Sequence, residues 1–195
     1  MRNLSSTSPV QSSNHNIASL YLEPMEPKME TSHFQEELKI GKIIAENLVE
    51  DGATLQLGIG AIPDSTLIAM KNHKDLGVHT EMLGDGVVDL IKSGAINNSK
   101  KSVMPGKVVT SFAFGTQKFY KFLNENPMIR EFSAVIVTEK RNSSDFDCCS
   151  WTNHSDVIRA NSKMTCINSG IEIDITGQIC SDSIGKAFYS GFGGQ

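Results

Sequence analysis

One carboxylate and two glycine-rich turns are the groups of this sequence whose places could support chemistry. Glu81 lies in GVHTEMLGDGVVDL, after a predicted strand at Gly77–Thr80 and before a predicted short helix. In an open parallel sheet, ligands bind at the carboxyl ends of the strands, so the position of Glu81 makes it a candidate although a lone glutamate on a loop is usually only solvated. His79 would point the same way along the strand, but buried histidines more often pack than react, and we assign it no role.

The turn GIGAIP, residues 58–63, joins a predicted strand to a predicted helix. Its glycines leave backbone N–H groups free to face an anion or a developing oxyanion, although a tight turn without any ligand explains them equally well. The dinucleotide fingerprint requires a third glycine where this chain has Pro63, so the turn argues against NAD. The run SGFGGQ, residues 190–195, is either a flexible end or a loop where substrate passes close to the backbone.

Alternating strand and helix patterns predict an α/β domain with a mostly parallel sheet covered by helices. The predicted helices lie in residues 31–52, in IPDSTLIAMK, and at 85–92 and 116–123, and Ile40, Ile44 and Leu48 of the first repeat at helical spacing. The predicted strands are ATLQLGIG, Gly77–Thr80, KVVTSFAF, FSAVIV and KMTCIN. In GIEIDITGQIC, isoleucines alternate with acidic residues before a Thr-Gly turn, which predicts a C-terminal β-hairpin.

Composition excludes several classes of protein. A hydrophobic content of 39% and a mean hydropathy of -0.19 are typical of a globular protein, and no apolar run is long enough to span a membrane. The net charge of -4 provides no basic surface for nucleic acid. The four cysteines follow neither a zinc pattern nor a disulfide framework, so we expect no metal and a reducing compartment, either mitochondrial or cytoplasmic.

The chain divides into a tail and one domain. Residues 1–30 are rich in Ser and Asn, and they match a disordered tail or linker better than a mitochondrial transit peptide. Residues 31–195 are expected to form the domain, with an unusual polar insert at about 136–149. The sequence stops in the middle of a glycine loop, so we expect the domain to be incomplete at its C-terminus.

Five motifs in the same order resemble the C-terminal domain of the acetyl-CoA hydrolase and 4-hydroxybutyrate CoA-transferase family. The resemblance runs from about residue 34 to residue 195 with one interruption. Its motifs are GATLQLGIGAIPD, LGVHTEMLGDGVVDLIKSGAI, KVVTSFAFGT, INSGIEIDITGQICSDSIG and FYSGFGGQ. The resemblance implies a CoA-transferase-like fold of the NagB/RpiA type, with two related α/β domains and a cleft between them.

The resemblance also implies a reaction and the residues for it. Glu81 would attack an acyl-CoA thioester, and CoA would pass through a glutamyl-CoA thioester to an incoming short carboxylate. Coenzyme A is then a substrate, and no cofactor is permanently bound. Asn153 would be a second catalytic residue. The implied oxyanion and CoA-binding groups are Gly58, Gly60, Ala61, Ile62, Gly191, Gly193 and Gly194.

Three functions are consistent with this resemblance. The first is a CoA-transferase for acetyl-CoA and a short carboxylic acid, the second is an acetyl-CoA hydrolase in which water accepts the acyl group, and the third is an inactive CoA-binding fragment. The chain departs from the family in having Ser155 where a proline is usual, and in lacking the family's N-terminal domain. That domain is the expected partner, possible self-association into a homo-oligomer is left open, and no membrane or nucleic-acid partner is expected.

Overall fold

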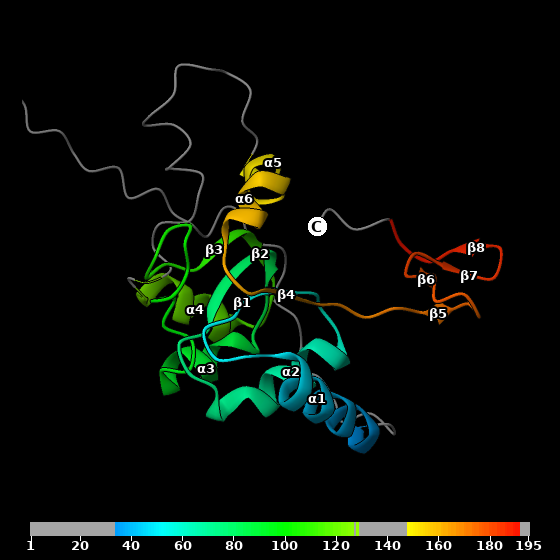
Figure 1. Ribbon diagram of the computed structural model, residues 1–195, viewed down its shortest axis with the longest axis horizontal. Helices are drawn as coiled ribbons and strands as arrows, with labels where there is room; N and C mark the ends of the chain where they lie inside the picture. The colour runs from blue at the N-terminus through cyan, green and yellow to red at the C-terminus, as the bar shows by residue number, and fades with distance from the viewer. Residues whose placement is uncertain (1–33, 127, 129–147, 192–195) are drawn as a thin grey trace, which may run out of the picture.

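A four-stranded parallel sheet forms the centre of the molecule. The computed structural model describes residues 34–126, 128 and 148–191. The strands are β1 (Thr54–Leu57), β2 (Gly77–Leu83), β3 (Val109–Ala113) and β4 (Met164–Ile167). Their order across the sheet is β3-β2-β1-β4, as Figure 1 shows. The predicted α/β class with a mostly parallel sheet is confirmed.

The direction of the strand order reverses at β1. β2 and β3 follow on one side of β1, whereas β4 returns to its other side, and ligand sites of open α/β sheets lie at the carboxyl ends beside such reversals. β1 pairs with β4 along its whole length, from Thr54↔Met164 to Leu57↔Ile167. Its pairing with β2 covers only Thr54↔Gly77 and Leu55↔Val78. The ladder therefore ends before the carboxyl ends of β1 and β2, and other contacts must connect the two strands there.

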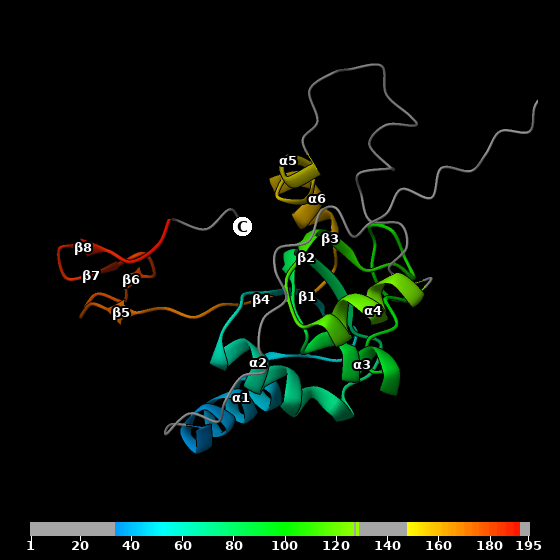
Figure 2. The same cartoon turned by 180° about the vertical axis from the view of Figure 1, so that it is seen from behind.

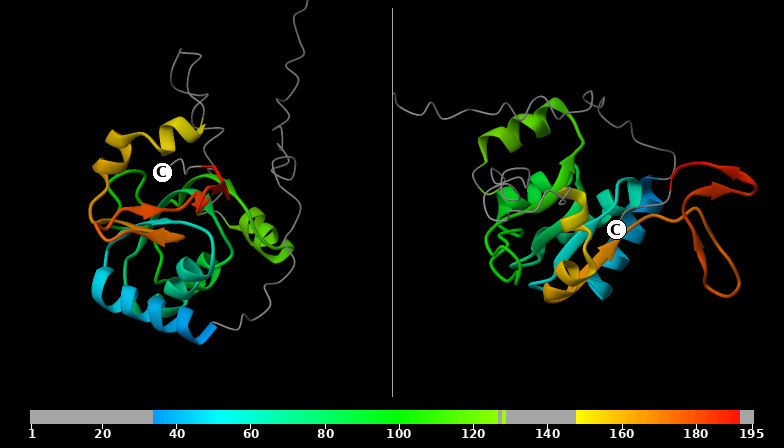
Figure 3. Two further views of the ribbon diagram at one scale, coloured as in Figure 1. Left: turned by 90° about the vertical axis from the view of Figure 1, so that its right-hand side faces the viewer. Right: turned by 90° about the horizontal axis from the view of Figure 1, so that it is seen from above.

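Helices lie on both sides of the sheet. In chain order, the helices before β4 begin with α1 (Phe34–Leu48), α2 (Ala61–Ala69) with the 3-10 turn η2 (Met70–Asn72), α3 (Val87–Ser93) and α4 (Gln117–Glu125). Figures 1 and 3 show α1, α2 and α3 on one side of the sheet, and α5 (Cys148–Thr152) and α6 (Ser155–Ala160) on the other. The buried apolar core includes Leu55, Leu57, Leu67, Met70, Leu76, Val78, Leu83, Val87, Leu90, Ile96, Phe119, Leu123 and Ile167.

The helix α1 packs through two small residues and one member of the predicted stripe, Ile44, which lies against the core. Gly41 and Ala45 are buried, while Ile40 is 44% exposed and Leu48 is 67% exposed. A Cβ atom on Gly41 would lie 2.6 Å from the backbone nitrogen of Thr66, so α1 and α2 are too close for a larger side chain. The prediction of the helix is confirmed, but Ile40 and Leu48 of the expected stripe are not buried, because the closeness of the two backbones selects small residues.

The strand β2 is longer than the sequence pattern predicts. It continues from Gly77 to Leu83, so Glu81 lies inside the strand and not after it. The extension follows β3, since the register continues through Met82↔Phe112 and Leu83↔Ala113. The helix α3 starts at Val87 and ends at Gly94, whose φ of 83° is the left-handed conformation expected of a glycine after a helix.

The segment between α4 and β4 is described only from Cys148 onward. The predicted strand FSAVIV, and the expected insert up to residue 147, lie outside the described residues. From Cys148 the chain forms α5 and α6, then enters β4, which confirms the strand predicted in KMTCIN. α5 packs on β2 and β3.

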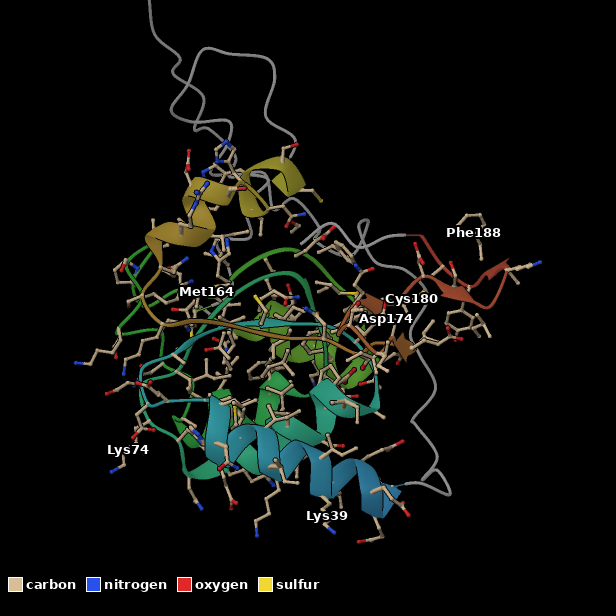
Figure 4. All side chains as sticks on the ribbon, turned by 45° about the vertical axis from the view of Figure 1, so that its right-hand side comes forward. Lys39, Lys74, Met164, Asp174, Cys180 and Phe188 are labelled. Atoms are coloured by element: carbon tan, nitrogen blue, oxygen red, sulfur yellow. The ribbon has the colours of Figure 1, made fainter. Side chains whose placement is uncertain are left out.

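The last described residues form an arm of two hairpins. The first pairs β5 (Glu172–Ile173) with β6 (Ile179–Cys180), which confirms the predicted hairpin, and the second pairs β7 (Ser183–Ile184) with β8 (Ala187–Phe188). Figures 1 and 2 show this arm extending away from the sheet, and Figure 4 shows the side chain of Phe188 at its far end. Among the described residues, no helix combines the length and apolar character that crossing a membrane would need.

Candidate active site

Glu81 occupies the carboxyl half of β2, next to the central strand β1. Its side chain is half-buried, and its backbone carbonyl accepts a hydrogen bond from the hydroxyl of Thr110 in β3 at 3.0 Å. Side chains alternate along a strand, so Glu81 shares a face with His79, and that is the face on which α5 packs. The structure therefore holds the carboxylate on a rigid strand between the sheet and the α5 side.

Threonine hydroxyls join the strands around Glu81. Oγ1 of Thr80 lies 3.1 Å from both the backbone nitrogen and the backbone oxygen of Leu57 in β1. Thr80 and Thr110 are in register, and each is fully or almost fully buried. These two residues carried no signal in the sequence, because threonine is common in strands and its partner lies on another strand.

Asn153 follows α5 directly. Its side-chain oxygen is buried and has no hydrogen-bond partner among the described residues, while its backbone nitrogen donates to Cys149 at 2.9 Å. Ser155 is the first residue of α6, and His154 accepts a hydrogen bond from the backbone of Asp156 at its start. The turn after Asn153 is thus formed by the cap of α6.

The turn at residues 58–62 divides into two parts. The N–H of Gly58 donates to the carbonyl of Ile167 at 2.8 Å, so the sheet already uses this amide. Gly60 has φ 121° and precedes α2, which begins with Ala61 and Ile62. The first amides of a helix have no acceptor within it, so Ala61 and Ile62 offer the donors that the sequence predicted for this turn.

The predicted second glycine loop is only partly described. Gly191 is exposed and follows β8 at the end of the arm, whereas Gly193 and Gly194 lie outside the described residues. A Cβ atom on Gly191 would meet no heavy atom within 4 Å, so the structure does not pack Gly191 against the group around Glu81. Figure 2 shows the hairpin arm that precedes Gly191 extending away from the sheet.

A side-chain pair closes the reversal point between β1 and β4. Gln56 and Asn168 exchange two hydrogen bonds, at 3.1 and 2.8 Å, although 112 positions separate them. A Cβ on Gly58 would lie 2.7 Å from Oδ1 of Asn168, so this pair is in contact with the glycine turn. Nothing in the sequence signals such a pair, because each residue alone is an ordinary polar residue.

A mainly apolar hollow of about 490 Å³ borders the same turn on the α2 side. Ile59 and Gly60 come from the turn, Gly84 and Gly86 follow β2, and Phe114 and Thr116 follow β3. Glu81 is not among its lining residues. No group of three His, Cys, Asp or Glu residues within the described ranges could hold a metal ion.

This arrangement defines an α/β domain whose candidate nucleophile and backbone donors lie at the carboxyl side of neighbouring parallel strands. Comparison with known proteins shows which proteins the chain is similar to. Residues 115–195 match the family described as acetyl-CoA hydrolase/transferase C-terminal domain. The chain is 57% identical over 159 residues to a succinyl-CoA:acetate/propanoyl-CoA:succinate CoA transferase of Fasciola hepatica, covering 80% of this chain and 30% of the relative.

Two 4-hydroxybutyrate CoA-transferases are also similar. That of Clostridium kluyveri is 48% identical over 80% of this chain and 34% of its own length. The crystal structure of that of Porphyromonas gingivalis superimposes with a TM-score of 0.65 at 43% identity, covering 80% of this chain and 35% of the other. The chain is therefore similar to proteins of the acetyl-CoA hydrolase/transferase family, and it spans about a third of the length of these relatives.

Proposed function

We propose that this chain supplies the nucleophile for CoA transfer between an acyl-CoA and a short carboxylate. The observation that carries the proposal is the position of Glu81, half-buried on β2 next to β1, the strand that leads into the turn before α2, in a chain similar to CoA transferases. The whole enzyme's activity is inferred, since the chain covers 30% of the Fasciola hepatica relative.

The proposed reaction has two exchanges at the same carboxylate. An oxygen of Glu81 bonds to the thioester carbonyl carbon, the carbon–sulfur bond breaks, and CoA leaves as a thiolate with an acyl-glutamyl anhydride on the enzyme. The thiolate then attacks the glutamyl carbonyl, the acyl group leaves as a carboxylate, and a glutamyl-CoA thioester remains. An incoming carboxylate reverses these steps and carries CoA away. Coenzyme A enters and leaves as a substrate.

Backbone and side-chain donors support this chemistry. Each addition step places a negative charge on an oxygen, and a fixed N–H donor stabilises such an oxyanion by roughly 3 kcal/mol where water is excluded. We assign this role to the backbone N–H groups of Ala61 and Ile62, with Gly60 allowing their approach, and to the side-chain NH2 group of Asn153. The hollow beside Ile59 and Gly60 provides apolar surface for part of the substrate, and binding there can be used to drive the steps at the thioester.

Trapping the thioester tests the proposal. We expect acetyl-CoA to convert Glu81 into a species that borohydride reduces to an alcohol, which peptide mass spectrometry locates at position 81. The variant Glu81→Gln has no carboxylate and should give no such peptide. If the chain is shown to bind acyl-CoA and Glu81 nevertheless stays unmodified, the proposal is contradicted.

Hydrolysis is the second candidate, favoured by the family's description, which includes hydrolases. In that case water resolves the same intermediate and free thiol accumulates. Measuring thiol release and CoA transfer in parallel separates the two. A release rate that added acetate or succinate does not change would select the hydrolase.

A further inference from the structure

The carboxyl end of α5 is attached to the sheet by a histidine that the proposed reaction does not use. Nε2 of His79 lies 2.8 Å from the carbonyl oxygen of Thr152, the last residue of α5. Both residues are 0% exposed. The imidazole ring also lies beside the indole of Trp151, with 6.1 Å between ring centroids. This is a buried contact between the strand that carries Glu81 and the helix that precedes Asn153.

The protonation of the ring follows from its surroundings. A carbonyl oxygen only accepts, so Nε2 must carry the hydrogen. Burial lowers the pKa of His79 and the charge of Lys101 lowers it further, while the hydrogen bond to Thr152 opposes them. The ring is therefore neutral near pH 7, and its buried Nδ1 has no partner among the described residues. Its one polar bond is directed at α5.

Asn153 is adjacent to this bond. Asn153 is the next residue after Thr152, and its buried side-chain oxygen has no partner within the described part of the chain. Glu81 lies two residues beyond His79 on the same face of β2. One side chain thus connects the strand of the nucleophile with the residue that precedes Asn153.

We propose that His79 is a positioning residue for the exchange at Glu81, because its bond to Thr152 fixes the Asn153 amide relative to the Glu81 carboxylate. The inference deepens the proposed function and rests on it, since it assigns Asn153 to the intermediates formed on Glu81. His79 itself touches neither substrate nor the reacting atoms. Its effect should therefore be restored by another side chain that donates from the same position.

Four variants separate this role from a merely structural one. His79→Leu removes the donor and keeps an apolar side chain, His79→Gln offers an N–H near the position of Nε2, and His79→Asn places its N–H one methylene short. The control is His73→Leu, because Nε2 of His73 lies 3.1 and 3.0 Å from the carbonyls of Ala45 and Val49 at the end of α1, a comparable contact at a helix end unconnected to Asn153.

Fluorescence reports the docking of α5 without any reaction. Trp151 is the one tryptophan of the chain, and it lies beside His79. We expect His79→Leu to increase the quenching of Trp151 by acrylamide and His79→Gln to restore the original value. The control His73→Leu should leave the quenching unchanged. Unchanged quenching in His79→Leu, or an equal change in the control, would overturn the inference.

The side-chain amide of Asn153 reports its relation to Glu81. When His79 is present, Glu81→Gln should shift the NMR signals of this amide. The shift should vanish when His79→Leu is added and return with His79→Gln. If His79→Leu does not fold, His79→Asn and His79→Gln provide the same comparison. Persistence of the shift without a donor at position 79 would contradict the inference.

The rate of thioester formation completes the test. Misplacing a catalytic group by about 1 Å lowers rates by roughly 100-fold, so His79→Leu should form the Glu81 thioester roughly 100 times more slowly, with His79→Gln recovering most of the loss. A His79→Leu variant that reacts at the original rate overturns the positioning role and leaves the proposed function intact. If the unsubstituted chain binds acyl-CoA without forming the thioester, the proposed function is rejected, and with it the chemical role of His79. The fluorescence and NMR results still decide whether His79 places Asn153.

Discussion

Oγ1 of Thr80 in β2 lies 3.1 Å from both the backbone nitrogen and the backbone oxygen of Leu57 in β1. The backbone ladder between these strands covers only Thr54↔Gly77 and Leu55↔Val78, so this hydroxyl continues the connection toward the carboxyl ends. The glycine turn begins one residue after Leu57, and Glu81 is the residue after Thr80. This hydroxyl therefore connects the strand of the proposed nucleophile with the strand that leads into the proposed donors.

Replacing Thr80 by valine should weaken this connection. Valine keeps the shape of the side chain, but it leaves the backbone groups of Leu57 without this partner in a buried position, which typically costs about 1 to 3 kcal/mol. We expect urea denaturation to show a loss in the free energy of unfolding of that size. The control Thr165→Val removes a hydroxyl whose hydrogen bond, to the carbonyl of Lys163 at 3.2 Å, is exposed, and it should change stability by less than about 0.5 kcal/mol. Equal losses in the two variants would contradict the role of Thr80.

Gly41→Ala tests the close contact of α1 with α2. Alanine favours a helix over glycine by about 1 kcal/mol, so an exposed position would gain stability. At Gly41 the new Cβ would lie 2.6 Å from the nitrogen of Thr66, and overpacking typically costs about 1 to 3 kcal/mol. We expect net destabilisation in thermal unfolding. Lys42→Ala, on the adjacent solvated face, should be nearly neutral, and a stabilised Gly41→Ala would show that the helices are farther apart.

Asp85 connects the segment after β2 to the start of α4. Its carboxylate accepts from the backbone nitrogen of Thr116 at 3.0 Å and from the hydroxyl of Thr116 at 2.6 Å, and that hydroxyl also accepts from Phe119 as the N-cap of α4. Asp85→Ala should lower the free energy of unfolding by about 1 kcal/mol, because the site is exposed and a helix cap is of that magnitude. Asp89→Ala, at another exposed aspartate nearby, should have a smaller effect, and faster amide exchange at the start of α4 should appear only in the first variant.

The sequence predicted the parts of the fold that local patterns determine. Short apolar runs followed by glycine turns marked β1 and the helix after it, and alternating isoleucines marked the hairpin β5–β6. Glu81 was found because it stands near the carboxyl end of a strand, although β2 extends two residues beyond it. The true end of β2 depends on its pairing with β3, which local alternation cannot reveal.

The missed features all depend on partners distant in the sequence. Gln56 and Asn168 form a pair across 112 positions, and the contact of His79 with Thr152 spans 73. Of the expected stripe Ile40, Ile44 and Leu48 on α1, only Ile44 packs against the core, because the backbone of α2 approaches α1 too closely for branched side chains at the contact. Helical periodicity identified the helix, whereas the buried face depended on the identity of its neighbour.

Lys101 makes the stability of the chain dependent on pH. Its side chain is 3% exposed, and Nζ donates to the carbonyls of Val78 and Lys107, both at 2.7 Å. Burial lowers the pKa of Lys101 from 10.5 to about 7. A neutral amine still has two N–H groups, so both hydrogen bonds survive loss of the proton. The unfolded chain keeps the proton between pH 7 and 10.5, and the folded chain does not.

The sign of the effect follows from this difference. The unfolded state binds more protons in that window, so the free energy of unfolding should rise with pH, by at most about 1.4 kcal/mol per pH unit for one proton. Below about pH 7 the two states carry the same charge at this site, and its contribution becomes constant. Lys101→Met removes the titrating group and should flatten the curve between pH 7 and 9. Burial raises the pKa of Cys166, so this thiol changes the free energy of unfolding with pH in the opposite direction. Because the unsubstituted chain and Lys101→Met both keep Cys166, the difference between their stability curves, measured by urea denaturation, isolates Lys101. Parallel curves would mean that Lys101 keeps its proton on folding.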